Sequence, residues 1–247
     1  PGHPPRPEPH PVIPLRDANP TRRPALVTLA IVVACCVAFG WELGLQASGE
    51  AAFEAAITDW GVVPGRLTAV WGDGGLLSGE SVTLLTSQFL HAGWLHLLGN
   101  LLYLWIFGNN VEDRLGRVGF LLFYLTGGVL AGLAQVAIDP ESQIPTIGAS
   151  GAIAATLGAY LVFYPGARVT SLVFLGFFYQ LVRIPAAIVL GFWFVLQLLD
   201  GIGSLGMTQG GGVAFFAHIG GFVFGATAAW LITLLGPGRP TSRVGVG

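Results

Sequence analysis

Six apolar segments, each about as long as a bilayer is thick, recur along this chain of 247 residues. A helix needs about 20 consecutive apolar residues to cross a bilayer, and about 17 form the lower limit. The composition agrees, because 53% of the residues are hydrophobic and only 10% are charged. The segments are residues 25–45, 95–111, 118–138, 148–164, 184–199 and 213–235, of which the fifth is marginal. We therefore predict an all-α fold, a polytopic membrane helical bundle with six transmembrane helices.

Two tails flank this apolar region. Residues 1–24 contain nine of the sixteen prolines, a composition typical of disordered or polyproline-like segments. We expect them to form a disordered cytoplasmic tail. Residues 25–236 form the predicted membrane domain, and residues 237–247 are expected to be a flexible second cytoplasmic tail.

The arginines predict how the helices are oriented. If the N-terminal tail is inside, ten of the eleven arginines fall on the cytoplasmic side and only Arg66 falls outside, as the positive-inside rule requires. Both chain ends are then cytoplasmic. Residues 171–182 are apolar but too short to span, and we expect them at the inner interface before the fifth helix. We interpret Glu112 and Arg114, after the second segment, as an interfacial anchor and turn.

Polar side chains inside membrane spans are costly and therefore mark functional candidates. His96 and Asn100 open the second segment and, four residues apart, share one helix face. Ser150 opens the fourth segment, and His218 lies early in the sixth. Because these three segments run from outside to inside, all four side chains are predicted at a similar depth in the outer half of the membrane. His91 is off the face of His96, and we interpret it as a residue that fixes the loop.

Small residues indicate that the fourth and sixth helices approach each other closely. Gly221 and Gly225 have the small-xxx-small spacing that lets helix backbones come together, and Gly148 and Gly151 flank the serine of the fourth helix. A histidine on such a closely packed helix can reach a serine on the facing one. The sequence therefore predicts a serine–histidine pair inside the membrane.

This pair has the chemistry of a hydrolase. Ser150 would be the nucleophile, and His218 the general base that removes its proton and later protonates the leaving amine. The backbone N–H of Ser150, the ring of His96 and the amide of Asn100 could donate to an oxyanion. No acidic residue at a matching depth has a clear claim to orient His218, which favours a dyad over a triad. Taken alone, however, the serine is better explained by helix packing. His96 alone is explained equally well by a hydrogen bond to a backbone carbonyl group.

In combination, these residues resemble the rhomboid family of intramembrane serine proteases, of bacterial type. The resemblance covers residues 25–235 and rests on three ordered motifs: His96-x-x-x-Asn100, Gly148-Ala149-Ser150-Gly151 and Ala217-His218-Ile219-Gly220-Gly221. In addition, Glu112-Asp113-Arg114-Leu115-Gly116 looks like the inner loop signature of the family. It implies a serine endopeptidase of the bacterial plasma membrane that cleaves single-pass transmembrane proteins near the outer leaflet. It also implies a structured first outer loop, and places Trp193 where a bulky residue controls lateral access of substrate. One departure is Ala154, which stands where better-known members carry an aromatic residue that stacks on the histidine.

Two other functions stay open. A non-catalytic rhomboid-like protein could bind membrane clients, and a small transporter could use the polar residues for a solute. We expect no cofactor and no metal, because the histidines lack ligand spacing, and no nucleic acid, because the net charge is only -2. The expected partners are transmembrane protein substrates and the lipid bilayer. The sequence does not indicate an oligomeric state.

Overall fold

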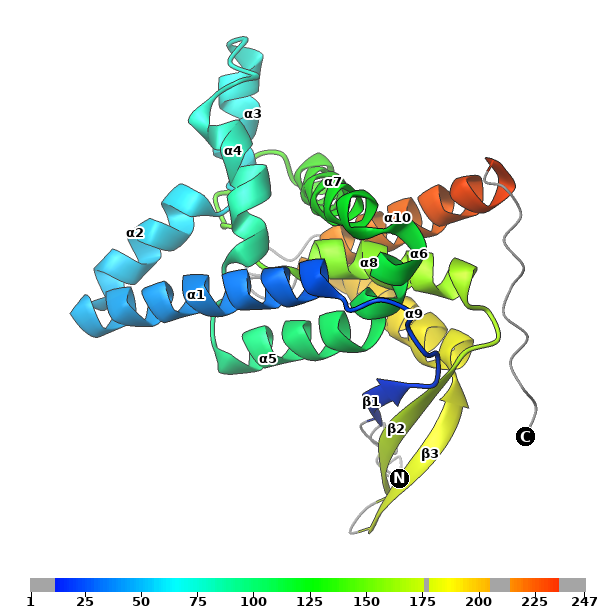
Figure 1. The fold of residues 1–247 in the computed structure, drawn as a ribbon. Coiled ribbons are helices and arrows are strands. Elements are labelled where there is room, and N and C mark those ends of the chain that lie inside the picture. The colour runs from blue at the N-terminus through cyan, green and yellow to red at the C-terminus, as the bar shows by residue number, and fades with distance from the viewer. Residues whose placement is uncertain (1–11, 176–177, 205–213, 236–247) are drawn as a thin grey trace, which may run out of the picture.

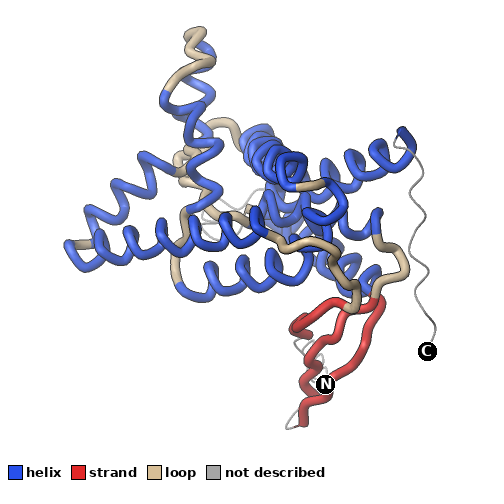
Figure 2. The backbone as a smooth tube through the Cα atoms, viewed as in Figure 1, coloured by secondary structure: helices blue, strands red, loops and turns tan. Residues whose placement is uncertain are grey.

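The protein is a bundle of helices with a small antiparallel sheet at one end (Figure 1, Figure 2). The computed structural model describes residues 12–175, 178–204 and 214–235. Among these residues, four helices are long and apolar enough to cross a membrane, and a fifth span results if one bent helix pair is counted. The four are α1 (Leu26–Ser48), α7 (Arg117–Ile138), α9 (Ala186–Ser204) and α10 (Phe215–Leu235).

The second predicted span is a continuous helical run that contains a π-helix. Its helical run, residues 94–115, consists of α5 (Trp94–Tyr103), the π-helix η2 (Leu104–Gly108) and α6 (Asn109–Leu115). This run bends by 80° from the preceding helical stretch, Gly79–Phe89, with which it forms the bent pair. That stretch contains α4 (Gly79–Thr86) and the 3-10 helix η1 (Ser87–Phe89), and the loop before it contains α2 (Glu50–Trp60) and α3 (Pro64–Gly72). The first predicted loop is thus structured.

The fourth predicted span is a short helix. α8 (Ser150–Phe163) has 14 residues, which corresponds to about 21 Å at 1.5 Å per residue. The hydrocarbon core of a bilayer is about 30 Å thick. Each of the six predicted segments therefore contains a helix, and the predicted helical bundle is confirmed. The marginal segment, however, is the fourth and not the fifth.

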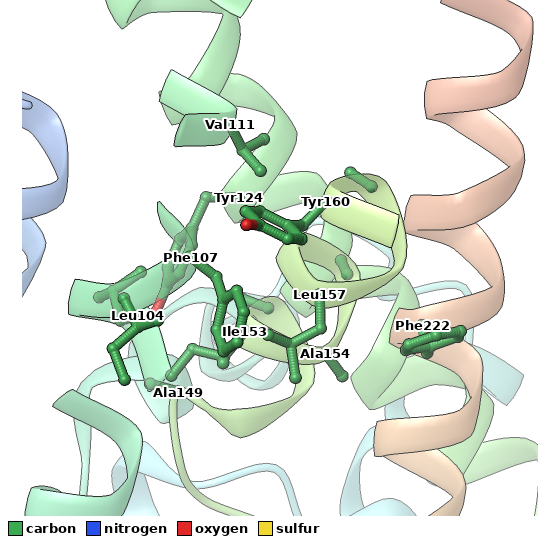
Figure 3. Packing of buried hydrophobic residues seen from close by; sticks show 14 of the residues in the cluster. Leu104, Phe107, Val111, Tyr124, Ala149, Ile153, Ala154, Leu157, Tyr160 and Phe222 are labelled. Carbon is green, nitrogen blue, oxygen red and sulfur yellow. The ribbon is translucent and has the colours of Figure 1, made fainter. Parts of the chain in front are cut away.

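α8 lies at the centre of the bundle, between α7, α10 and the α5–α6 run (Figure 1). Residues 151–160 are all buried, as expected for a helix that is apolar on every side. Figure 3 shows the side of α8 that carries Ile153, Leu157 and Tyr160 facing Leu104 and Phe107. The rings of Phe107 and Tyr160 meet edge to face, with centroids 4.9 Å apart. The core of the protein is therefore built around α8.

Backbone touches backbone where α8 meets α10. A Cβ atom on Gly225 would overlap the carbonyl oxygen of Ala155, and one on Gly221 would overlap the carbonyl oxygen of Gly151. Only glycine fits at these two positions of α10. The close approach that the small-xxx-small spacing predicted is therefore present in the structure.

Glu112 caps the beginning of α1. Its buried carboxylate accepts hydrogen bonds from the backbone N–H groups of Val27 and Thr28, over 3.0 and 2.7 Å, and from the Thr28 hydroxyl over 2.8 Å. These N–H groups are among the first four of α1, which have no partner within their own helix, and the helix dipole favours a negative charge there. This capping contact is a role of Glu112 that its interpretation as an interfacial anchor did not include. The residue joins the end of α6 to the start of α1.

The sheet corrects part of the prediction that residues 1–24 are disordered, because residues 12–17 form a strand. β1 (Val12–Asp17) pairs antiparallel with β2 (Arg168–Leu175), which pairs antiparallel with β3 (Phe178–Pro185). Residues 171–182, for which we expected an interfacial stretch, thus lie largely in a β-hairpin. The proline content of the tail concealed a short strand whose backbone groups are satisfied by a distant partner. Residues 1–11 of the first predicted tail and all of the second, residues 237–247, lie outside the described residues.

Asp17 ties this strand to α8. Its Oδ2 atom accepts hydrogen bonds from the Tyr160 hydroxyl over 2.9 Å and from the Asn110 amide over 2.7 Å. Asn19 in turn donates to the Tyr160 oxygen over 2.7 Å. Burial raises the pKa of Asp17, since it penalises the charged form. The N-terminal segment is therefore anchored to the end of α8 far from Ser150.

Replacing Glu112 with alanine is expected to destabilise the fold. The substitution leaves one buried N–H group, one part-buried N–H group and a buried hydroxyl unpaired. We therefore expect a loss of about 2–3 kcal/mol of unfolding free energy, measured by denaturation in detergent micelles. Asp113→Ala is the matched control, because Asp113 accepts one exposed bond from the Arg22 backbone over 3.2 Å. A similar loss in both variants would show that Glu112 has no special capping role.

Candidate functional site

The predicted serine and histidine lie within hydrogen-bonding distance of each other. Ser150 is the first residue of α8, and His218 is the fourth residue of α10. The Ser150 Oγ atom is 2.7 Å from the Nε2 atom of His218, a typical length for a hydroxyl group that donates to a ring nitrogen. The glycine contact between α8 and α10 makes this distance possible, because Gly151 and Gly221 each lie close in sequence to one of the two residues.

Gly148 shapes the turn that leads into Ser150. Its φ angle is +125°, in the region that favours glycine, and its N–H donates to the carbonyl oxygen of Ser87 over 2.8 Å. A Cβ atom at Gly148 would lie 2.7 Å from the Nε2 atom of His96. Because Ser150 begins α8, its backbone N–H has no partner within the helix. The turn thus presents, beside the serine, a backbone donor that α8 itself does not use.

The ring of His96 presents an N–H group to this turn. The Nδ1 atom of His96 accepts a hydrogen bond from the backbone N–H of Ala92 over 3.3 Å. In a neutral imidazole the other nitrogen then carries the proton. That nitrogen is Nε2, the atom closest to the Cβ position of Gly148. His96 therefore has a donor close to Ser150.

Asn100 lies one turn after His96 on the same face of α5. Its side chain is buried, and its Nδ2 atom has no hydrogen-bond partner among the described residues. An unpaired buried amide costs about 1–3 kcal/mol, so such a group calls for a functional explanation. The Nδ2 group of Asn100 is thus a second donor, one helical turn from His96, that a bound group could use.

Two side chains of α9 hold His218. The Nδ1 atom of His218 is 2.6 Å from the Oε1 atom of Gln197. The ring of Trp193, one turn earlier on α9, lies against the ring of His218, with centroids 5.8 Å apart. This indole is the aromatic neighbour that Ala154 does not provide. Sequence reasoning assigned Trp193 only to lateral access of substrate. It missed Gln197, for which the only sequence signal is a single amide within an apolar segment.

His91 and Glu42 fix the loop before α5. His91 is fully buried, and its backbone N–H donates to both carboxylate oxygens of Glu42, over 2.9 and 3.2 Å. The rings of His91 and His96 meet edge to face, with centroids 5.1 Å apart. His91 thus packs against His96 in this loop, and the loop-fixing role expected for it stays a prediction. Glu42 gave no sequence signal that we recognised.

A small cavity of about 30 Å³ lies beside the serine. It is lined by Ser150, Gly148 and Gln88, among others, and the Oε1 atom of Gln88 is buried without a partner among the described residues. This volume accommodates about one water molecule. Over the described ranges, no group of three or more metal-ligating side chains occurs.

The fold and the site together define the class of this protein. It is a polytopic membrane protein with a serine–histidine pair at the ends of two helices. Residues 78–234 match the Rhomboid domain family. This match covers more than half of the chain, and the protein therefore belongs to the rhomboid family.

Three relatives illustrate the breadth of this similarity. Rhomboid protease GluP of Bacillus subtilis (strain 168) is 43% identical over 86 residues, 35% of this chain and 16% of the relative. Rhomboid-like protein 11, chloroplastic, of Arabidopsis thaliana is 29% identical over 157 residues, 60% of this chain and 51% of the relative. Presenilin-associated rhomboid-like protein, mitochondrial, of Homo sapiens is 29% identical over 155 residues, 61% of this chain and 37% of the relative. The matched region thus spans about half, or less, of each of these relatives.

Replacing Gly148 with alanine is expected to strain the turn before Ser150. The φ angle of +125° is unfavourable for alanine, and the added Cβ atom would press on the ring of His96. We expect a loss of about 2 kcal/mol of unfolding free energy in detergent. Gly44→Ala is the control, because a Cβ atom there has no neighbour within 4 Å. Equal stability of both variants would mean that the turn is not constrained.

Proposed function

We propose that this rhomboid protein is an active serine endopeptidase that cuts single-pass transmembrane proteins inside the membrane, near the outer leaflet. Membership of the family already makes it an intramembrane protease or a rhomboid-like relative. The observation that carries the finer proposal is the 2.7 Å hydrogen bond between Ser150 Oγ and His218 Nε2. Non-catalytic packing does not require a hydroxyl group aimed at a ring nitrogen.

The reaction begins with acylation of Ser150. The hydroxyl proton passes to Nε2 of His218 as Oγ attacks the scissile carbonyl carbon. The negative charge on the carbonyl oxygen is stabilised by the Ser150 backbone N–H, the His96 Nε2–H and the Asn100 amide. When the C–N bond breaks, His218 returns the proton to the leaving amine. The unpaired amide of Asn100 supports this role, because the developing oxyanion would satisfy it.

Deacylation completes the cycle. A water molecule attacks the acyl carbon while its proton passes to His218, and the proton then returns to Ser150 as the ester bond breaks. The cavity beside Ser150 offers room for such a water molecule. Both half-reactions therefore use the same two side chains.

The substrate must unwind before it can be cut. Within lipid, a transmembrane helix has all its backbone carbonyl groups hydrogen-bonded, so none is open to attack by Ser150. Segments with small or helix-breaking residues near the outer leaflet should therefore be preferred. We place lateral access of the substrate beside α9, where Trp193 lies against His218.

The protein is a multi-pass membrane protein, and the arginine distribution supports a bacterial plasma membrane with both termini in the cytoplasm. Relatives named chloroplastic and mitochondrial occur in the same family. Protease protection in inverted membrane vesicles would test the orientation.

Labelling with a fluorophosphonate probe tests the central proposal. The full chain in detergent should be labelled, whereas Ser150→Ala and His218→Ala should lose labelling, because the probe requires an activated serine. Ser48→Ala, at the far end of α1, is the control and should be labelled like wild type. A folded wild type that remains unlabelled would favour a rhomboid-like protein that binds clients without cutting them.

Replacing Asn100 with alanine should mainly slow turnover. Loss of one oxyanion donor typically lowers kcat by about 10²- to 10³-fold, and KM for a transmembrane substrate reconstituted in liposomes should change little. Asn109→Ala is the matched control, because Asn109 is an amide of α6, in the same helical run. An unchanged kcat in Asn100→Ala would exclude the amide from the oxyanion hole.

A further inference from the structure

We infer that Gln197 is a positioning residue that keeps the proton on Nδ1 of His218 and so leaves Nε2 free to take the proton of Ser150. This inference rests on the proposed function and extends it to a residue outside the serine–histidine pair. It also identifies what replaces the acidic member of a triad in this chain.

The hydrogen bonds define the tautomer of His218. A neutral imidazole has one nitrogen that donates and one that accepts. Nε2 is 2.7 Å from the Ser150 hydroxyl and must accept its proton for the reaction to begin. The proton of the ring then belongs on Nδ1, which is 2.6 Å from the carbonyl oxygen of Gln197. That oxygen can only accept, so it favours the one tautomer in which His218 can act as a base.

The same contact remains useful during the reaction. When His218 takes up the serine proton, Nδ1 still carries its own proton and still donates to Gln197. The amide dipole points its negative end at the cationic ring and thus stabilises the charge that forms. Gln197 therefore favours both the correct starting tautomer and the protonated intermediate.

An amide is suited to this depth in a membrane. An ionised carboxylate next to His218 would be costly in a low-dielectric environment, whereas a neutral amide offers an acceptor without a net charge. Gln197 lies within α9, which is apolar enough to span a membrane. The dyad thus gains an orienting acceptor without a buried charge.

Trp193 completes the arrangement on the same face of α9. It lies four residues before Gln197, so both side chains project from one side of the helix. The indole ring packs against His218 and also against Phe222, with ring centroids 6.3 Å apart in the second contact. The rings of Phe194 and Phe222 stack at 4.5 Å, which holds α9 against α10. Gln197 is therefore presented by a helix that is fixed beside the histidine.

Two readouts on the full chain in detergent test this role. The first is the rate of fluorophosphonate labelling together with kcat and KM for a transmembrane substrate. Gln197→Leu should lower the labelling rate and kcat by about 10-fold or more, a fraction of what a general base contributes, and leave KM nearly unchanged. Gln197→Glu retains an acceptor oxygen at the same reach and should restore most of the rate. Leu198→Ala, an exposed neighbour on α9, should behave like wild type.

The second readout is the ¹⁵N spectrum of the histidine rings, which does not depend on activity. In wild type, the His218 signals, identified by their loss in His218→Ala, should show a protonated Nδ1 and an unprotonated Nε2. In Gln197→Leu they should show a mixture of both tautomers. A wild type that is labelled, with equal rates and an unchanged tautomer in Gln197→Leu, would overturn the inference.

The two proposals can fail separately. A wild type that resists the probe while its His218 tautomer depends on Gln197 would overturn the protease and support the role of Gln197 in fixing the ring. A labelled wild type whose Gln197→Leu variant loses rate and tautomer together supports both.

Discussion

The contact of two helix backbones, α8 against α10, is the constraint on which the rest of this protein depends. In a bilayer the hydrophobic effect does not drive helices together, so close packing relies on van der Waals contact between small residues. Gly221 and Gly225 on α10 lie against the carbonyl oxygens of Gly151 and Ala155. A Cβ atom at either glycine would overlap these oxygen atoms, so a larger side chain would push apart the helices that carry Ser150 and His218. The glycines therefore matter to chemistry as much as to stability.

Buried carboxylates join distant parts of the chain by hydrogen bonds. Glu112, Glu42 and Asp17 are each buried, and each accepts hydrogen bonds from groups that lie far away in the sequence. Such charges are costly within a membrane protein unless they are paired or hydrogen-bonded. Here they hold three parts of the chain whose positions hydropathy does not predict: the start of α1, the loop before α5 and the N-terminal strand. The apolar helices supply the bulk of the bundle, and these carboxylates set how its ends are joined.

Much of this arrangement was predictable from sequence because its signals are local. Hydropathy identified all six helical segments, and the glycines beside Ser150 and His218 indicated that their helices would meet. The missed features depend on distant partners. β1 lies in a proline-rich tail and pairs with residues some 150 positions later, and Gln197 looks like any single amide in an apolar segment until the rotation of α9 about its axis is known. Likewise, nothing near Glu112 in the sequence reveals the free N–H groups of α1 that it caps.

The length of α8 has a consequence for the depth of the site. At about 21 Å, α8 is roughly 9 Å shorter than the hydrocarbon core. Its far end is tied down, because the Tyr160 hydroxyl donates to Asp17 and the Tyr164 hydroxyl donates to the carbonyl oxygen of Asn110. If this tied end lies at the inner boundary of the hydrocarbon core, the whole shortfall is left at the Ser150 end. A straight helix beside α8 would therefore place, at the level of Ser150, the residue about six positions inside its own membrane boundary. The rise per residue of a helix thus relates the depth of Ser150 to a position in the sequence of any transmembrane segment that passes it.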